Sequence, residues 1–118
     1  MSEILLRFCE GAAVVLYRRY PKGRAENVPA RVDLYTYAGG YAWGYGGSGP
    51  NALSHAIAGK IFEFVPLTPS ELSVRARIIL EGLVIRLDGA SEHTLDYSVF
   101  SNLFPGEMLD IDSMPCNE

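Results

Sequence analysis

A glycine-rich stretch in the middle of the chain has the residue types that could hold a phosphate group. Residues 44–49 read Gly-Tyr-Gly-Gly-Ser-Gly and fit the pattern G-x-G-x-x-G, between an aromatic run and a predicted helix. At such a junction, backbone N–H groups and the positive end of the helix attract an anion. The candidate residues for binding a ligand or partner are Trp43, Tyr45, Gly46, Gly47, Ser48, Gly49, Asn51 and His55.

The surroundings of this stretch do not fit a dinucleotide-binding Rossmann domain. The preceding run alternates aromatic with small residues, whereas a buried parallel strand is continuously apolar. No βαβ repeat follows, and the nearest acidic residue, Glu63, falls inside the predicted helix. Two interpretations of the glycines stay open: a phosphate cradle, or a tight strand-to-helix corner that needs positive φ angles.

Nothing else in the sequence forms a convincing catalytic or metal-binding group. The run Gly46-Gly47-Ser48-Gly49-Pro50 departs from the serine-hydrolase pattern G-x-S-x-G at its last position. His55 has no acidic residue placed to orient it, and His93 has only Asp96 nearby. We therefore predict a protein that is not an enzyme, with no catalytic residues, no metal and no cofactor.

The distribution of charge limits the classes of partner. The formal net charge is −4, but the first 60 residues hold seven Lys or Arg against four Asp or Glu, and the rest hold three against ten. This acidic balance disfavours nucleic-acid binding by bulk charge, while one loop supplies a local basic patch. The patch consists of Arg18, Arg19, Lys22 and Arg24.

The totals indicate one ordinary globular domain. The chain has 118 residues, of which 48% are hydrophobic. No apolar run reaches the ~18 residues of a membrane span, no signal peptide opens the chain, and Cys9 and Cys116 form no C-x-x-C pair. We expect a cytoplasmic protein with no membrane association, a single domain over residues 1–106, and an acidic tail or edge strand over residues 107–118. A homodimer stays open.

Four strands are predicted ahead of the glycine-rich stretch. Residues 4–8 and 13–17 are short apolar runs separated by a Glu-Gly turn, and residues 30–37 alternate apolar with charged side chains. Two glycines then lead into a fourth strand over residues 41–45. A three-residue loop between the last two strands would pair Tyr37 with Tyr41 and Tyr35 with Trp43, whereas a two-residue turn would separate them.

The three-residue loop, which we favour, predicts an aromatic sheet face. Its members are Tyr35, Tyr37, Tyr41, Trp43 and Tyr45. Such a face could stack the bases of a single-stranded nucleic acid, or helices could cover it and make it core. In either case Trp43 and Tyr45, next to the glycines, should be partly exposed.

Helical spacing of apolar residues predicts the second half of the chain to be mostly helical. One helix starts at Pro50 and stops before Pro66. A second opens with the capping box Thr68-Pro69-Ser70-Glu71 and carries an apolar stripe to Leu87, although residues 83–87 also fit a strand. A short third helix over residues 95–104 is capped by Asp96. The predicted fold class is α+β: an antiparallel meander of about four strands followed by two to three helices packed on one face.

The run Trp43-Gly44-Tyr45-Gly46-Gly47-Ser48-Gly49-Pro50, followed by a helix of small apolar residues, resembles the signature of a family of small uncharacterised domains from bacteria and their phages. Many members carry Ala-Gln after the proline, where this chain has Asn51-Ala52. The family has no assigned activity. The resemblance implies a mobile-element setting, in which small acidic proteins often bind and block host machinery.

Three functional hypotheses follow. The first is a non-enzymatic protein that contacts a protein partner through the glycine-rich turn and the adjoining aromatics, in its concrete form an inhibitor of a host defence complex. The second is a protein that binds a nucleotide or another phosphate-bearing ligand on the amides of residues 46–51. The third is a binder of single-stranded nucleic acid.

Overall fold

The sheet is built around a hairpin of two seven-residue strands, β1 (Glu3–Cys9) and β2 (Ala12–Arg18). The structure is a computed structural model that describes residues 2–20 and 23–109. In the hairpin turn, Glu10 has a φ of 52° and Gly11 a φ of 84°, as the two central residues of a type I′ turn require. Four side chains of the hairpin are buried toward the helices: Ile4, Leu6, Val15 and Tyr17.

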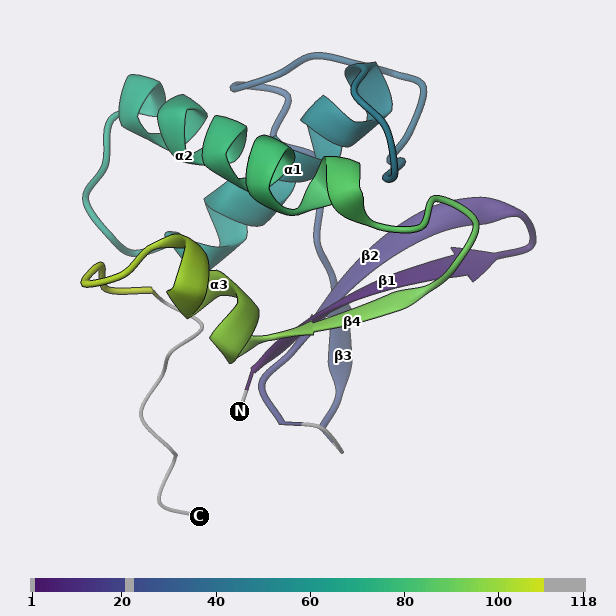
Figure 1. Cartoon of the computed structure of the whole chain (residues 1–118), viewed down its shortest axis with the longest axis horizontal. Helices are drawn as coiled ribbons and strands as arrows, with labels where there is room; N and C mark the ends of the chain where they lie inside the picture. Colours follow the sequence, from purple (N-terminus) through teal and green to yellow (C-terminus); the bar gives the residue numbers. More distant parts are fainter. Residues whose placement is uncertain (1, 21–22, 110–118) are drawn as a thin grey trace.

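Two shorter strands complete the sheet, in the order β3-β2-β1-β4. β3 (Ala25–Asn27) pairs with the end of β2, and β4 (His93–Asp96) pairs with the start of β1. All three pairings are antiparallel. The β1–β2 hairpin therefore extends past both neighbours, and Figure 1 shows its turn projecting beyond the helices.

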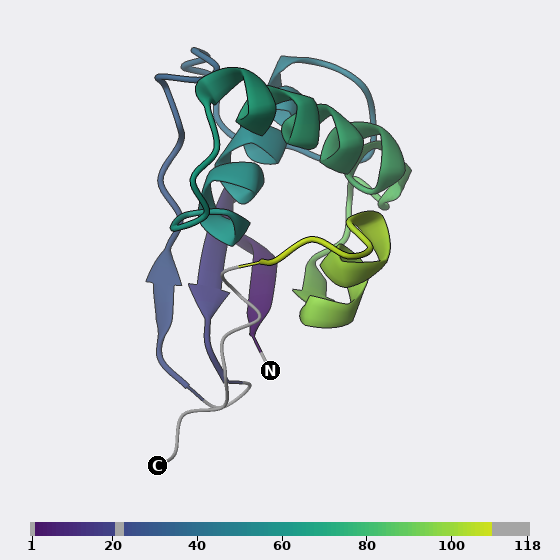
Figure 2. The ribbon, with the colours of Figure 1, turned by 90° about the vertical axis from the view of Figure 1, so that its left-hand side faces the viewer.

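Three α-helices lie to one side of the sheet (Figure 2): α1 (Ser48–Ile61), α2 (Pro69–Gly82) and α3 (Tyr97–Leu103). A 3₁₀ turn, η1 (Val84–Arg86), follows α2. The predicted α+β class is thereby confirmed, with a four-stranded antiparallel sheet and three helices.

α1 is the central element of the core. Every residue from 52 to 59 is buried, which is typical of a helix covered on all sides rather than of one with a solvent face. Gly59 allows a close contact, because a Cβ atom there would lie 2.9 Å from Cγ of Arg31. The Arg31 side chain therefore packs directly on α1 at this glycine.

Both predicted helix caps are present. The Thr68 hydroxyl accepts a hydrogen bond from the Glu71 N–H at 3.1 Å, and the Glu71 carboxylate accepts one from the Thr68 N–H at 2.8 Å. Asp96 caps α3, where its carboxylate accepts from the backbone N–H groups of Ser98 and Val99. These bonds satisfy donors that a helix start would otherwise leave unpaired.

The third and fourth predicted strands are wrong. Residues 30–37 and 41–45 contain no strand, so the pairing of Tyr37 with Tyr41 and of Tyr35 with Trp43 does not occur. Gly40 at φ 90° and Gly44 at φ 96° interrupt the extended backbone on both sides of the aromatic run. The segment is instead an irregular connection between β3 and α1, and the remaining strands come from residues 25–27 and 93–96.

The predicted continuation of the second helix to Leu87 is also wrong, and so is the alternative strand over residues 83–87. α2 ends at Gly82, and the chain makes the η1 turn before reaching Leu87. Of the predicted tail over residues 107–118, only 107–109 are described: Leu109 is buried in the core and Glu107 pairs with Arg75 at 2.9 Å. The rest of the tail lies outside the described residues.

Candidate functional site

The glycine-rich corner is locked by a crossing of two backbones. Gly44 has a φ of 96°, and a Cβ atom there would lie 2.6 Å from the Cα of Gly89. Its N–H donates to the carbonyl of Val84 at 2.9 Å. Only glycine fits this position without displacing the second loop, because both the dihedral angle and the space exclude a side chain.

The other glycines of the corner differ in what they require. A Cβ atom at Gly49 would lie 2.9 Å from the Cβ of Ala42, so the close approach of that segment to α1 depends on glycine. A Cβ atom at Gly47 would lie 2.8 Å from the Tyr45 ring. At Gly46 no atom lies within 4 Å of that position, and its φ is not in the left-handed region. Gly44 is therefore required by both its dihedral angle and its packing, Gly49 by its packing alone, and Gly46 by neither.

Trp43 is an internal anchor. Its exposed fraction is 2%, its indole N–H donates to the carbonyl of Ser91 at 2.9 Å, and its ring stacks on Phe8 with centroids 5.1 Å apart. The edge of the indole also meets the ring of His93. The expected partial exposure of Trp43 is wrong, because the loop carries this side chain inward to the place where β1 and the loop before β4 meet. Tyr45 is exposed, at 53%.

The predicted aromatic sheet face does not exist. Tyr35 stacks on His55, with ring centroids 5.1 Å apart. The Tyr41 hydroxyl donates to the carbonyl of Val28 at 3.0 Å, and burial raises the pKa of this phenol to about 12. With Trp43 buried and Tyr35 stacked on His55, the five aromatics do not form one exposed stacking face, although Tyr41, Trp43 and Tyr45 line one groove.

Asn51 and His55 turn inward along α1. The Asn51 side-chain amide donates to the Gly47 carbonyl at 2.9 Å, and His55 Nδ1 donates to the Asn51 carbonyl at 2.7 Å. Both residues line a pocket of 380 Å³ between α1 and α2, which also includes Arg77. The structure thus separates these two predicted site residues from Tyr45, although they are close in sequence.

Few amides at the start of α1 are available to an anion. Pro50 has no N–H, the Asn51 N–H donates to the Gly47 carbonyl, and Gly49 is buried. Tyr45 packs over Gly47. Ser48 remains as the exposed position of the first turn. A phosphate cradle normally gathers several such donors, so this arrangement is a poor one for a phosphate group.

A groove opens between the tip of the β1–β2 hairpin and the glycine-rich corner. This corner groove has a volume of 360 Å³ and is lined by Phe8, Gly11, Ala12, Ala13, Gly39, Gly40, Tyr41, Ala42, Trp43, Tyr45 and Gly89. Phe8 is 39% exposed there. Among the described residues, no charged side chain lines the groove. Phe8 and Ala13 were not predicted as site residues. The alternation along the first strand could have indicated Phe8, because it puts this side chain on the core face beyond the part that the helices cover.

A second groove adjoins the first along β2. This edge groove has a volume of 250 Å³ and is lined by Ala13, Val14, Val15, Asn27, Val28, Pro29, Ala30, Tyr37, Gly40, Tyr41 and Ala52. It shares Ala13, Gly40 and Tyr41 with the corner groove. Its lining, too, contains no charged residue in the part of the chain that the structure describes.

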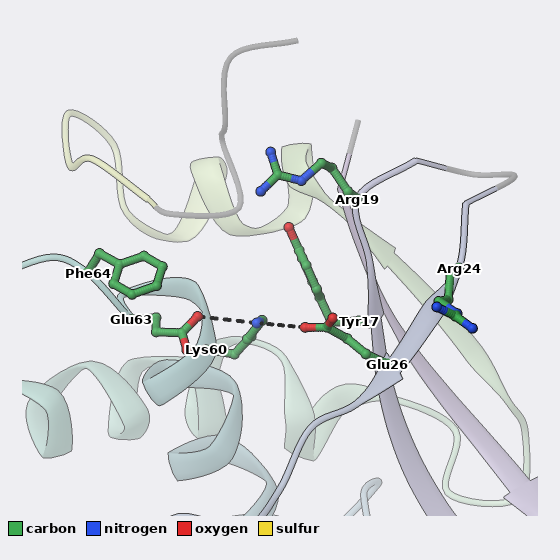
Figure 3. Close-up of a pocket in the computed structure, with 7 residues that line it drawn as sticks. All are labelled: Tyr17, Arg19, Arg24, Glu26, Lys60, Glu63 and Phe64. Atoms are coloured by element: carbon green, nitrogen blue, oxygen red, sulfur yellow. Dashed lines mark hydrogen bonds and ion pairs between the residues drawn. The ribbon is translucent and has the colours of Figure 1, made fainter. Parts of the chain in front are cut away.

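The predicted basic patch is divided between two places. Arg18 pairs with Glu3 at 2.7 Å across the β1–β2 ladder. Arg19 and Arg24 line a pocket of 350 Å³ near the end of α1 (Figure 3), and Lys22 lies outside the described residues. Of the predicted patch, the structure places Arg19 and Arg24 in one pocket and pairs Arg18 with Glu3.

The pocket in Figure 3 is centred on an ion-paired lysine. Lys60 Nζ lies 3.2 Å from a carboxylate oxygen of Glu26 and 3.2 Å from one of Glu63, and 4.5 Å from the centroid of the Tyr17 ring. Burial lowers the pKa of Lys60, but the hydrogen bonds to the two carboxylates outweigh it, so the pKa is raised. The lysine joins β3 to the end of α1 and is neutralised by its own neighbours.

The described residues hold neither a cluster that could bind a metal ion nor a helix that could span a membrane. Within residues 2–20 and 23–109, no three His, Cys, Asp or Glu side chains gather in a way that could hold a metal ion. In the same part of the chain, no helix has the length and apolar character that crossing a membrane requires.

Comparison of the sequence with protein-family models, with curated proteins and with solved structures found no match.

Proposed function

We propose that this protein is a non-enzymatic binding protein that recognises a partner polypeptide through the corner groove. The observation that carries the proposal is the exposure of two aromatic side chains, Tyr45 and Phe8, on the walls of an uncharged groove. Exposed aromatics around a concave, uncharged surface are characteristic of protein interfaces, where they contribute a large share of the binding energy.

The contacts that hold the groove walls in place support the same proposal. Trp43 is fixed by its hydrogen bond to Ser91 and by stacking on Phe8. The crossing of Gly44 and Gly89 holds the two loops that carry the groove wall. A groove that is formed before the partner arrives loses less conformational entropy on binding, which favours affinity.

Gly46 adds an independent argument. It is exposed, neither its dihedral angle nor its packing requires glycine, and it directly follows Tyr45. A missing side chain at such a position leaves the backbone open to close approach by a partner.

The biological setting in the proposal rests on the resemblance of residues 43–50 to the phage and bacterial domains. In that setting the partner is a host defence complex, which the protein inhibits by occupying one of its surfaces. The small size and the net charge of −4 suit a protein that acts by contact alone.

The nucleotide and nucleic-acid alternatives have less support. The N-terminal turn of α1 offers few open amides, and the buried Trp43 cannot stack on a base. The Tyr41 hydroxyl is hydrogen-bonded to the Val28 carbonyl, and Arg31 forms an ion pair with Asp33 at 2.7 Å. Stacking platforms for single strands need several aromatics and cations on one surface.

Site-specific photocrosslinking tests the proposed function. A benzoylphenylalanine would replace Tyr45 in one variant and Val74 in another; Val74 is exposed to a similar degree, at 59%, and lies on α2 away from the corner groove. In a lysate of the bacterium that carries the gene, the variant at Tyr45 should give a discrete protein adduct that excess unlabelled protein suppresses. Equal adducts at both positions, or none at Tyr45, would contradict the proposal.

A further inference from the structure

One edge of the sheet is left open beside the corner groove. β3 is three residues long and pairs only with Leu16, Tyr17 and Arg18 of β2. One more hydrogen bond joins the strands, from the Val28 N–H to the Val15 carbonyl at 2.9 Å. Beyond Val28 the chain leaves the sheet, so the half of β2 nearest the hairpin turn has β1 on one side and no strand on the other.

The backbone groups of Ala13 face this open edge. In an antiparallel strand, successive residues direct their N–H and C=O groups to opposite sides, and the closing pair of a two-residue hairpin is hydrogen-bonded. Here the closing pair is Cys9 with Ala12, and Val15 directs its carbonyl toward β3. Ala13 must therefore point its N–H and C=O away from β1, and no hydrogen bond from residues 2–20 or 23–109 reaches either group.

The opposite edge of the hairpin tip is protected. The Phe8 N–H donates to the Glu92 carboxylate at 2.9 Å, where β4 no longer pairs with β1. Arg7 crosses the same edge and donates to the His93 carbonyl at 2.7 Å and to the Thr94 hydroxyl at 2.9 Å. Proteins commonly block a strand edge with charged side chains in this way. The β2 edge at Ala13 has no such block among the described residues.

The open backbone groups lie where the two grooves meet. Ala13 lines both the corner groove and the edge groove, and Gly40 and Tyr41 line both from the opposite side. In an extended chain placed against β2, side chains two residues apart point to the same face and lie about 7 Å from each other. Two such side chains would enter the two grooves.

We infer that an extended segment of the partner binds by adding an antiparallel strand to the β2 edge at Ala13, with uncharged apolar or aromatic side chains at positions i and i+2 in the corner and edge grooves. The inference rests on the proposed function. An unpaired donor and acceptor on one residue specify a polypeptide backbone, and linings without charge specify the side chains. Residues 37–41 wall the grooves opposite β2, which favours a single chain over the edge of a second copy.

The probe is a phage-displayed library of random linear peptides, selected on the intact protein and counter-selected on Tyr45→Ala. A selected peptide is then synthesised in versions that carry one backbone N-methyl group at each successive position. Strand addition predicts that methylation of the one peptide N–H that pairs with the Ala13 carbonyl weakens binding about tenfold or more, and that methylation of the two adjacent residues has little effect. This scan uses the unaltered protein and needs no variant to fold.

Ala13→Pro tests the edge from the protein side. The substitution deletes an N–H that the β1–β2 ladder does not use, and proline is tolerated in strands at such outward positions. The expected result is a Tm close to that of the unaltered protein and at least about tenfold weaker peptide binding. Arg86→Ala, in an exposed turn outside both grooves, should leave the affinity unchanged.

The outcomes separate the inference from the proposed function. A peptide that loses affinity in Tyr45→Ala, but that tolerates N-methylation at every position and ignores Ala13→Pro, would overturn strand addition and leave the corner groove as a binding site. A concentration-dependent dimer in light scattering that Ala13→Pro abolishes, with no peptide selected, would assign the edge to a second copy and also overturn the inference. Failure to select any peptide that depends on Tyr45, together with no adduct in the crosslinking experiment, would contradict both the strand addition and the proposed function.

Discussion

At the scale of single residues, the glycines of the corner have different roles, and substitution separates them. Gly44→Ala should lower the free energy of unfolding by about 2 kcal/mol or more, because it forces a side chain into the left-handed region and against Gly89. Gly46→Ala should change it by less than about 0.5 kcal/mol. Chemical denaturation of the two variants checks this. Equal losses in both would mean that the backbone crossing does not distinguish them.

If the proposed function holds, Gly46→Ala has a second use. A variant that keeps its stability but loses the Tyr45 adduct would connect the open backbone at this position with partner binding. The sequence pattern alone could not make this distinction, because four of the six residues from 44 to 49 are glycines and their individual requirements depend on Ala42, Tyr45 and Gly89.

Ionisation of Tyr41 should lower the stability of the folded protein at alkaline pH. Its pKa is raised from 10.0 to about 12 by burial, so the folded state favours the neutral phenol. The associated stability is complete below the unfolded pKa of about 10 and is lost as the pH rises toward about 12. A titration followed by tyrosinate absorbance should show one late-ionising tyrosine that is missing in Tyr41→Phe. If the variant shows the same late step, the assignment to Tyr41 fails.

Tyr41→Phe should also lower the free energy of unfolding by about 1 kcal/mol at neutral pH, because the Val28 carbonyl loses its donor at the point where the chain leaves the sheet. Tyr37→Phe is a suitable control, since Tyr37 is an exposed tyrosine of the same loop.

At the scale of elements, local signals in the sequence were reliable and pairing signals were not. The capping box at Thr68 and the strands at residues 4–8 and 13–17 were predicted from neighbouring residues alone, and they are present. The alternation over residues 30–37 and the aromatic run over 41–45 looked equally strand-like. Gly40 and Gly44, with positive φ angles, interrupt the extended backbone around residues 41–45. The outer strand on β1 comes instead from residues 93–96, which are distant in sequence.

The cap of α3 predicts an acid-sensitive helix start. The hydrogen bond from the Ser98 side chain and those from the Ser98 and Val99 backbone hold the pKa of Asp96 below its ordinary value of 3.8. The folded state therefore favours the carboxylate, and its contribution is present above the unfolded pKa and is lost as the pH falls through the lower folded pKa. Thermal unfolding below pH 4 should be less steeply dependent on pH in Asp96→Asn than in the unaltered protein.

Asp96→Ala provides the matched variant, because it removes the cap at every pH. It should lower stability by about 1 kcal/mol at neutral pH, where Asp96→Asn retains a capping side chain. Identical pH profiles in all three proteins would show that the cap does not contribute to acid sensitivity.

At the scale of the whole molecule, the core extends past residue 106, where the sequence placed the end of the domain. Leu109 is 2% exposed and packs in the main cluster, whereas the adjacent Met108 is 77% exposed. Leu109→Ala should therefore lower the free energy of unfolding by about 3 kcal/mol, and Met108→Ala by less than about 0.5 kcal/mol. Urea denaturation of the two variants measures the difference, and similar values would contradict the packing of Leu109.

The candidate site shows the same limit of sequence reasoning on a larger scale. Tyr45 and the corner glycines could be named from a contiguous motif. Phe8, Ala13 and Gly89 could not, because they reach the grooves from three other parts of the chain. What turns the motif into a groove is the meeting of the hairpin tip with two loops.

That meeting has a consequence for the order of synthesis. The Trp43 indole is held by Ser91, 48 residues later, and the Phe8 amide by Glu92, 84 residues later. On the ribosome, the hairpin, α1 and α2 emerge before the loop that anchors Trp43. A nascent chain that ends before Glu92 therefore lacks the contacts that close the corner groove, so the candidate site forms only after this loop has been synthesised.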